Sequence, residues 1–229
     1  MKEAFVKYDY AEIILDSKRP YIKVSSGGEV INGKYVGGKW GVDVYEDIEN
    51  VFLPVKYDYV GNVIWYADAE NGDMFFEDSY YGFEVATEGY FDEDGAYCDG
   101  KYGLVFTKEM VIDYKYGYIS DAAIGKAIVA NNGERLNDGS YKNGKWGIVE
   151  LYTGREVATL KYDFIDKFRV RIMEDYEYVV NFPYLKFRLN DKWGLLNSQN
   201  GEEIEKAEYS ENEIDELLEK YETQYIESL

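Results

Sequence analysis

The amino-acid sequence predicts an all-β protein: a tandem repeat of short antiparallel β-hairpin or three-stranded units, followed by a C-terminal amphipathic helix. Two short motifs recur in fixed alternation along the chain, as they do in repeat arrays. Turn signals separate segments in which apolar and polar residues alternate, as in half-buried strands. Near the C-terminus the apolar residues change to helical spacing. These patterns leave open whether the units form an open stack or a propeller-like ring.

The repeat is defined by two motifs. The first is Lys-Tyr-Asp followed by an aromatic residue, with one degraded copy, and it occurs at Lys7–Tyr10, Lys56–Tyr59, Lys115–Tyr118 and Lys161–Phe164. The second is lysine, an aromatic residue, glycine and an aliphatic residue, and it occurs at Lys39–Val42, Lys101–Leu104, Lys145–Ile148 and Lys192–Leu195. We therefore predict a repeat array over residues 1–205, with units at about 7–55, 56–114, 115–160 and 161–205.

Local chemistry favours strands within each unit. Asn143-Gly144 lies between alternating segments, and both positions suit the positive φ angles of a tight hairpin turn. The glycine directly after each aromatic residue of the second motif leaves room for a neighbouring backbone. The recurrence of Asp9, Asp58 and Asp163 predicts a structural role for them, such as accepting hydrogen bonds from turn amides. The recurring Trp40, Trp146 and Trp193 are expected in the core.

These motifs resemble the WG-repeat family of bacterial proteins, whose units combine a Lys-Trp-Gly segment with a later Lys-Tyr-Asp segment. The resemblance covers nearly all of residues 7–205. It departs from the family pattern at Tyr102, which replaces tryptophan, and at Gly117, which replaces aspartate. The resemblance implies a β-rich array with a binding or scaffold role, and it implies no catalytic residues.

The C-terminal segment, residues 206–229, is predicted to be a capping helix. Ser210 and Glu213 have the spacing of a capping box, in which each side chain bonds the backbone of the other residue. The apolar residues that follow share one helical face: Ile214, Leu217, Leu218, Tyr221 and Tyr225. We expect a helix over 211–226 that covers the exposed end of the array.

The charge is strongly negative and unevenly distributed. The formal net charge is −20. Residues 56–114 hold 14 acidic and 3 basic side chains, a net charge of −11, and no Lys or Arg lies between Lys56 and Lys101. Such a surface repels nucleic acid and anionic membranes, which require basic patches. It attracts a basic protein, so a basic partner is predicted.

The acidic stretch is also rich in aromatic residues, and aromatic anchors among charges are typical of protein interfaces. The predicted partner-binding residues are Asp73, Phe75, Phe76, Glu77, Asp78, Tyr80, Tyr81, Asp92, Glu93 and Asp94. The alternative interpretation is that the rings form strand core and the acids lie on solvated loops. The exposure of Phe75, Phe76, Tyr80 and Tyr81 distinguishes the two.

Catalytic and metal-binding functions are poorly supported. The chain has no histidine, which removes the commonest general base and metal ligand. The single Cys98 has acidic neighbours, which disfavour its reactive thiolate form. Asp92-Glu93-Asp94-Gly95 lacks the spacing of a calcium-binding loop. We predict a chain with no catalytic residues, no metal site and no cofactor.

We therefore expect a non-enzymatic protein-binding module, such as an acidic inhibitor or immunity-type protein that caps a basic partner. No apolar run resembles a signal peptide or a membrane span, so a cytoplasmic location is expected. One alternative is a carbohydrate or cell-wall binder that stacks Trp and Tyr rings on sugars. Another is a nucleic-acid mimic whose carboxylates block a DNA-binding enzyme.

Overall fold

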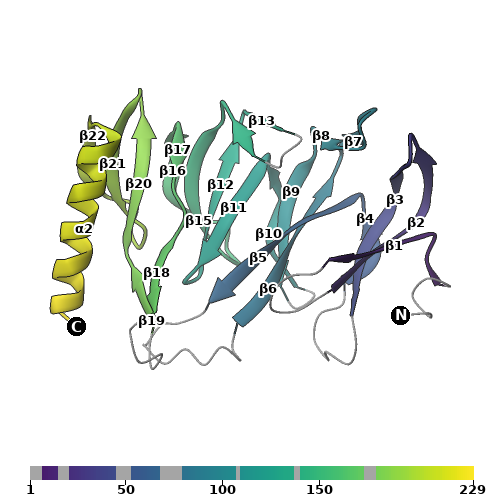
Figure 1. The fold of residues 1–229 in the computed structure, drawn as a ribbon, viewed down its shortest axis with the longest axis horizontal. Coiled ribbons are helices and arrows are strands. Elements are labelled where there is room, and N and C mark those ends of the chain that lie inside the picture. Colours follow the sequence, from purple (N-terminus) through teal and green to yellow (C-terminus); the bar gives the residue numbers. More distant parts are fainter. Residues whose placement is uncertain are drawn as a thin grey trace. The chain divides into compact units, whose positions relative to one another are not determined.

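The computed structural model describes residues 7–14, 21–44, 53–67, 79–106, 109–136, 140–172 and 179–229. It confirms the all-β repeat fold with a C-terminal helix (Figure 1). By their contacts the residues divide into two units. The first unit comprises residues 1–64, 81–117 and 135–140, and the second comprises 65–80, 118–134 and 141–229.

Four antiparallel sheets of four strands follow one another along the described part of the chain. The first contains β1 (Tyr10–Ile14), β2 (Tyr21–Ile31), β3 (Lys34–Val44) and β4 (Leu53–Tyr57). The second contains β5 (Tyr59–Ala67), β6 (Ser79–Thr87), β9 (Lys101–Phe106) and β10 (Glu109–Tyr116). The third contains β11 (Tyr118–Ala123), β12 (Lys126–Asn131), β15 (Lys145–Glu150) and β16 (Glu156–Tyr162). The fourth contains β17 (Phe164–Ile165), β20 (Tyr184–Leu189), β21 (Lys192–Asn197) and β22 (Glu203–Tyr209).

Three two-stranded ribbons complete the described strands. They are β7 (Tyr90–Phe91) with β8 (Tyr97–Cys98), β13 (Glu134–Arg135) with β14 (Tyr141–Lys142), and β18 (Arg169–Ile172) with β19 (Val179–Phe182).

Each motif has a constant place in the sheets. The second motif always lies in the third strand of a sheet: it begins β9, β15 and β21, and it lies within β3. The Lys-Tyr pair of the first motif ends the fourth strand, and the aromatic residue after the aspartate begins the next sheet. Each sheet therefore has four strands, one more than the predicted three-stranded unit. The fourth strand forms because the chain turns back once more before it enters the next sheet.

The glycine of the second motif allows this fourth strand to close on the third. A Cβ atom on Gly147 would lie 2.6 Å from the carbonyl oxygen of Ala158, and one on Gly41 would lie 2.6 Å from that of Leu53. Gly103 and Gly194 face backbone oxygens of their fourth strands in the same way. The predicted close approach of a neighbouring backbone is confirmed.

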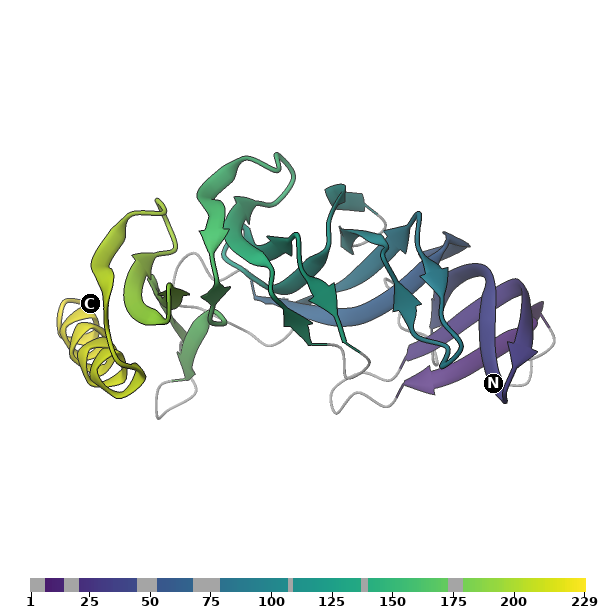
Figure 2. The ribbon, with the colours of Figure 1, turned by 90° about the horizontal axis from the view of Figure 1, so that it is seen from above.

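Helix α2 (Glu211–Glu227) begins where the sequence predicts and packs on the fourth sheet (Figure 2). Ser210 is its N-cap, and both hydrogen bonds of the capping box with Glu213 are present. Ile214 and Leu218 are buried against Leu195 of β21. The helix thus covers apolar surface that a further repeat would cover in the middle of the array. Among the described residues, no helix is long and apolar enough to cross a membrane.

Candidate functional site

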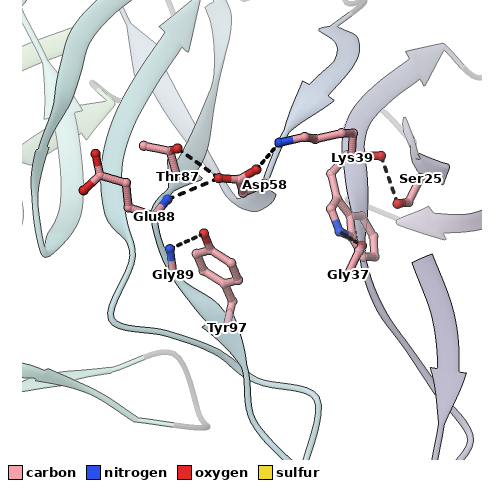
Figure 3. Close-up of polar contacts among 9 residues, drawn as sticks. Ser25, Gly37, Lys39, Asp58, Thr87, Glu88, Gly89 and Tyr97 are labelled. Carbon is pink, nitrogen blue, oxygen red and sulfur yellow. Dashed lines mark hydrogen bonds and ion pairs between the residues drawn. The ribbon is translucent and has the colours of Figure 1, made fainter. Parts of the chain in front are cut away.

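The polar residues of the two motifs meet at the junction between the first two sheets (Figure 3). The Asp58 carboxylate accepts hydrogen bonds from the Lys39 ammonium, the Thr87 hydroxyl (2.9 Å) and the Glu88 backbone N–H (3.2 Å). Burial works to raise the pKa of Asp58, but these donors outweigh it and the pKa lies below its usual value. Asp58 therefore joins the second motif of one sheet to a turn of the next.

The contact with a turn amide recurs in the other two copies of the motif that keep the aspartate. Asp163 accepts from the Asn190 backbone N–H (2.7 Å) and from Lys145 (2.5 Å), and Asp9 accepts from the Gly27 backbone N–H (2.7 Å). The prediction that these aspartates accept hydrogen bonds from turn amides is confirmed. They are structural residues of the repeat.

Aromatic residues form a second recurring contact. Tyr35 stacks on Tyr10 with ring centroids 4.8 Å apart, and its hydroxyl accepts from the Gly28 backbone N–H (2.8 Å). Tyr97 and Tyr141 make the equivalent stack and hydrogen bond in the next two sheets. Trp40 and Trp146 lie edge-on to these stacks and are buried, whereas Trp193 lies edge-on to Phe164 and is half-buried. The prediction of core tryptophans is thus confirmed for Trp40 and Trp146.

The predicted partner-binding residues are only partly described. Asp73, Phe75, Phe76, Glu77 and Asp78 lie outside the described residues. Tyr80 and Tyr81 lie in β6, where the backbone alone is described. The choice between core and interface for these rings therefore remains a prediction. The three remaining residues, Asp92, Glu93 and Asp94, form the turn between β7 and β8.

This turn is ordered by its own first residue. The Asp92 carboxylate accepts from the Asp94 N–H (2.9 Å) and the Ala96 N–H (2.8 Å). Glu93 and Asp94 are exposed. Asp92 is consequently a structural member of the turn, and Glu93 and Asp94 carry its accessible charge.

An exposed apolar hairpin tip lies beside this acidic turn. Val30 and Ile31, at the end of β2, are 68% and 44% exposed, and Glu29 before them is also exposed. Ile31 pairs with Lys34 across the hairpin, and the Lys34 ammonium donates to the Asp94 carbonyl oxygen. We call Glu29, Val30, Ile31, Glu93 and Asp94 the hairpin-tip surface. Its mixture of exposed aliphatic and acidic side chains suits a protein partner with apolar and basic groups.

Sequence reasoning missed the apolar half of this surface. Asn32-Gly33 has the same hairpin signal in the sequence as Asn143-Gly144. In the structure Asn32 and Gly33 have positive φ angles of 51° and 80°. A hairpin placed there puts Val30 and Ile31 at its tip, so that signal identifies the exposed pair. The Lys34 contact to Asp94 carries no sequence signal, because its partners are 60 residues apart.

A second cluster of charges lies in the interior of the first unit. Glu84 is fully buried and pairs with Arg135, whose guanidinium carbon lies 4.6 Å from the centre of the Tyr102 ring. A side chain on Gly61 would collide with the Glu84 carboxylate. Burial raises the pKa of Tyr102 and lowers that of Lys23, whose ammonium lies 5.3 Å from the Tyr59 ring centre.

Glu84 and Arg135 pair with one another. Both Glu84 oxygens accept from the Arg135 guanidinium, at 2.9 and 2.8 Å. The pairing uses the planar fork of arginine against a carboxylate. A general acid or base needs its proton within reach of a substrate, and the Glu84 side chain has no exposed surface. The cluster is a buried ion pair with aromatic walls.

Cys98 is a free, half-buried thiol in β8. Burial raises its pKa, and the nearby Asp92 carboxylate raises it further. The direction agrees with the expectation from the sequence, but burial rather than acidic neighbours is the larger cause. In the described part of the chain, no group of three or more acidic or cysteine side chains could hold a metal ion.

No protein-family model, no curated protein and no solved structure matches this chain. Function must therefore be argued from the hairpin-tip surface and from the repeat that positions it.

Proposed function

We propose that this chain is a non-enzymatic protein-binding module that captures a basic partner on the hairpin-tip surface. The observation that supports this proposal is the contact between Lys34 and Asp94, which brings an exposed aliphatic pair beside an acidic turn. A hydrophobic centre with a polar rim is the usual anatomy of such interfaces. The repeat provides a rigid support, because the hairpin and the turn both belong to the first unit.

The sign of the partner's charge follows from electrostatics. The chain carries a net charge of −20, and residues 56–114, which include the acidic turn, account for more than half of it. Opposite charge on the partner accelerates association, and salt weakens this steering. An inhibitor or immunity-type role, in which the acidic surface caps a basic toxin or enzyme, is the form of this function that we propose. We also propose that the repeat is of the WG type.

The test uses the full chain on an affinity support and the source cell's lysate at low and high salt. The test variant is Glu93→Gln with Asp94→Asn, which removes two exposed charges and leaves Asp92 to hold the turn. The matched control is Glu216→Gln with Glu219→Gln, which removes two exposed charges from α2. A third variant, Val30→Ser with Ile31→Ser, removes the apolar tip.

A captured protein should then be purified and its affinity for each variant measured. We expect a basic partner whose affinity falls with salt, falls by about tenfold in the turn and tip variants, and is unchanged in the control. Equal loss in the control would mean that net charge alone attracts the partner. A partner whose affinity is unchanged by salt and by both test variants would overturn the proposal.

A further inference from the structure

Two adjacent turns of the second unit hold residues in an unfavourable backbone conformation. Among the described residues, the non-glycine positions with positive φ are Asn32, Glu88, Asp99, Ile124, Asn132, Asn143, Tyr152, Asn190 and Asp191. Asn and Asp tolerate this region best, whereas β-branched and bulky residues are outliers there. Ile124 (φ 49°) and Tyr152 (φ 65°) are the two members of this set with large apolar side chains.

These two outliers lie on neighbouring turns. Ile124 is in the turn between β11 and β12, and Tyr152 is in the turn between β15 and β16. Strands β12 and β15 are paired, with Lys126 opposite Glu150, and the Leu151 N–H donates to the Gly125 carbonyl oxygen at 2.8 Å. The strained residues are thus held together by the sheet and by a hydrogen bond between their turns.

The turn type does not require strain at Tyr152, as the fourth sheet shows. In the Tyr152 turn, the Gly154 N–H donates to the Glu150 carbonyl oxygen (3.0 Å). The turn between β21 and β22 is closed by the equivalent hydrogen bond, from the Gly201 N–H to the Asn197 carbonyl oxygen (2.8 Å). Gln199 stands where Tyr152 stands, and its φ is not positive. Of these two turns, the Tyr152 turn alone has a further hydrogen bond, from the Thr153 N–H to the Leu151 carbonyl oxygen (2.8 Å). This bond closes a γ-turn whose central residue, Tyr152, has a positive φ.

The strain presents an aromatic ring to solvent. Tyr152 is 68% exposed. A strained residue costs on the order of 1–3 kcal/mol and persists where the surrounding structure holds it, often at binding sites. At 68% exposure the ring gains little from burial within this chain, whereas burial against another molecule would offset the cost of the strain.

The charged side chains beside Tyr152 have hydrogen-bond partners within the chain. The Glu150 carboxylate accepts from the Arg155 Nε (3.0 Å) and the Thr153 hydroxyl (3.0 Å). The Lys126 ammonium donates to the Gln199 side-chain oxygen (3.0 Å). The surroundings of the ring therefore present little free charge, in contrast to the hairpin-tip surface of the first unit.

We propose that Tyr152, with Ile124 beside it, is a preorganised anchor that inserts into an uncharged apolar pocket of a protein partner. A ring that projects from a rigid turn suits a concave pocket, and fixing it in advance lowers the ordering cost of binding. Because the neighbouring charged side chains are already hydrogen-bonded within the chain and the anchor itself is uncharged, this contact should be much less sensitive to salt. It is independent of the proposed acidic surface, whose binding should weaken with salt.

The test places a photoreactive benzophenone amino acid at position 152 of the full chain and, as a control, at position 90, where Tyr90 is 56% exposed on the first unit. Cross-linking in source-cell lysate at high salt should give an adduct from position 152. The native chain and Tyr152→Phe should compete for that adduct. Tyr152→Asn and Ile124→Asn should compete about tenfold less well.

A stability measurement distinguishes loss of the anchor from loss of the fold. Asparagine tolerates positive φ, so Tyr152→Asn and Ile124→Asn should raise the midpoint of thermal unfolding while they weaken competition. Equal competition by the native chain and Tyr152→Asn would overturn the proposal, as would a lower midpoint in that variant. Absence of an adduct specific to position 152 would overturn it too. Tyr152-dependent binding to a glycan array with no protein adduct would assign the turn to a sugar instead.

Discussion

Glu84 and Arg135 form a bidentate ion pair in the interior of the first unit, although 51 residues separate them in the chain. Burying two charges is expensive, and their mutual attraction offsets that cost only while both are present. The Glu84 side chain has no exposed surface, and the Arg135 side chain is 12% exposed. The pair should therefore be far more sensitive to the loss of one partner than to the loss of both.

We predict that Glu84→Gln lowers the free energy of unfolding by about 3 kcal/mol, because the Arg135 charge is left buried without a counter-ion. The double variant Glu84→Met with Arg135→Met should be much closer to the native chain. Urea denaturation of the native chain, Glu84→Met, Arg135→Met and the double variant provides the complete thermodynamic cycle. Additive effects in that cycle would contradict the close pairing of the two side chains.

The junction aspartates should make the fold sensitive to acid. Hydrogen bonding from Lys145 and the Asn190 amide holds the pKa of Asp163 below its usual value. A lowered pKa in the folded state gives stability that is present above the unfolded value, near 3.9, and is lost as the pH falls through the folded value. Asp163→Ala should cost about 1 to 2 kcal/mol at pH 7. That difference should shrink as the pH falls below about 4, as followed by thermal unfolding; a difference independent of pH would exclude the carboxylate as its source.

Asp121 should have the opposite pH dependence. Burial raises the pKa of its carboxyl to about 6. Hydrogen bonds from the Phe168 and Ala122 amides and the charge of Lys167 lower this pKa, and the charge of Asp166 raises it, but burial is the largest cause. The folded state then holds a proton that the unfolded chain releases near pH 4, so this contribution to stability is lost as the pH rises through 6.

Asparagine at position 121 cannot titrate. The stability of Asp121→Asn relative to the native chain should therefore increase by up to about 3 kcal/mol between pH 4 and pH 7, on top of any constant offset. Thermal unfolding of both proteins across this range measures the slope. A flat difference would mean that the carboxyl keeps an ordinary pKa.

The repeat and its helix could be predicted from sequence because their signals are local. A capping box at Ser210 and Glu213 lies within one helical turn, and the glycine of each second motif acts on the adjacent strand. The Glu84–Arg135 pair and the contact that brings the hairpin tip to the acidic turn were not predicted, because their partners come together only through tertiary contacts. The strain at Tyr152 also leaves no sequence signal, since Tyr-Thr-Gly is an ordinary turn sequence.

The glycine of the second motif offers a direct test of the repeat. A Cβ atom on Gly147 would lie 2.6 Å from the Ala158 carbonyl oxygen and 3.0 Å from the Leu160 amide nitrogen, both backbone atoms. Gly147→Ala should cost about 1–3 kcal/mol by forcing β16 away from β15. Gly41→Ala, which meets the backbone of β4 in the same way, should have a similar cost. A neutral effect on the urea midpoint in both variants would contradict the strand pairing described here.

The last junction of the array replaces an aspartate with a helix cap. Tyr209 pairs with Trp193 as Tyr162 pairs with Trp146, so Ser210 stands where Asp163 stands one repeat earlier. Its side chain accepts from the Glu213 backbone N–H, and the Glu213 carboxylate accepts from the Ser210 backbone N–H at 2.8 Å. Ser210→Ala should therefore destabilise the chain by about 1 kcal/mol, whereas Ser210→Thr keeps the hydroxyl, should retain the cap and should cost little. Hydrogen exchange in α2 and the urea midpoint measure both effects. If the alanine and threonine variants lose equal stability, capping is not what Ser210 contributes, and its hydroxyl would have to act through the sheet instead.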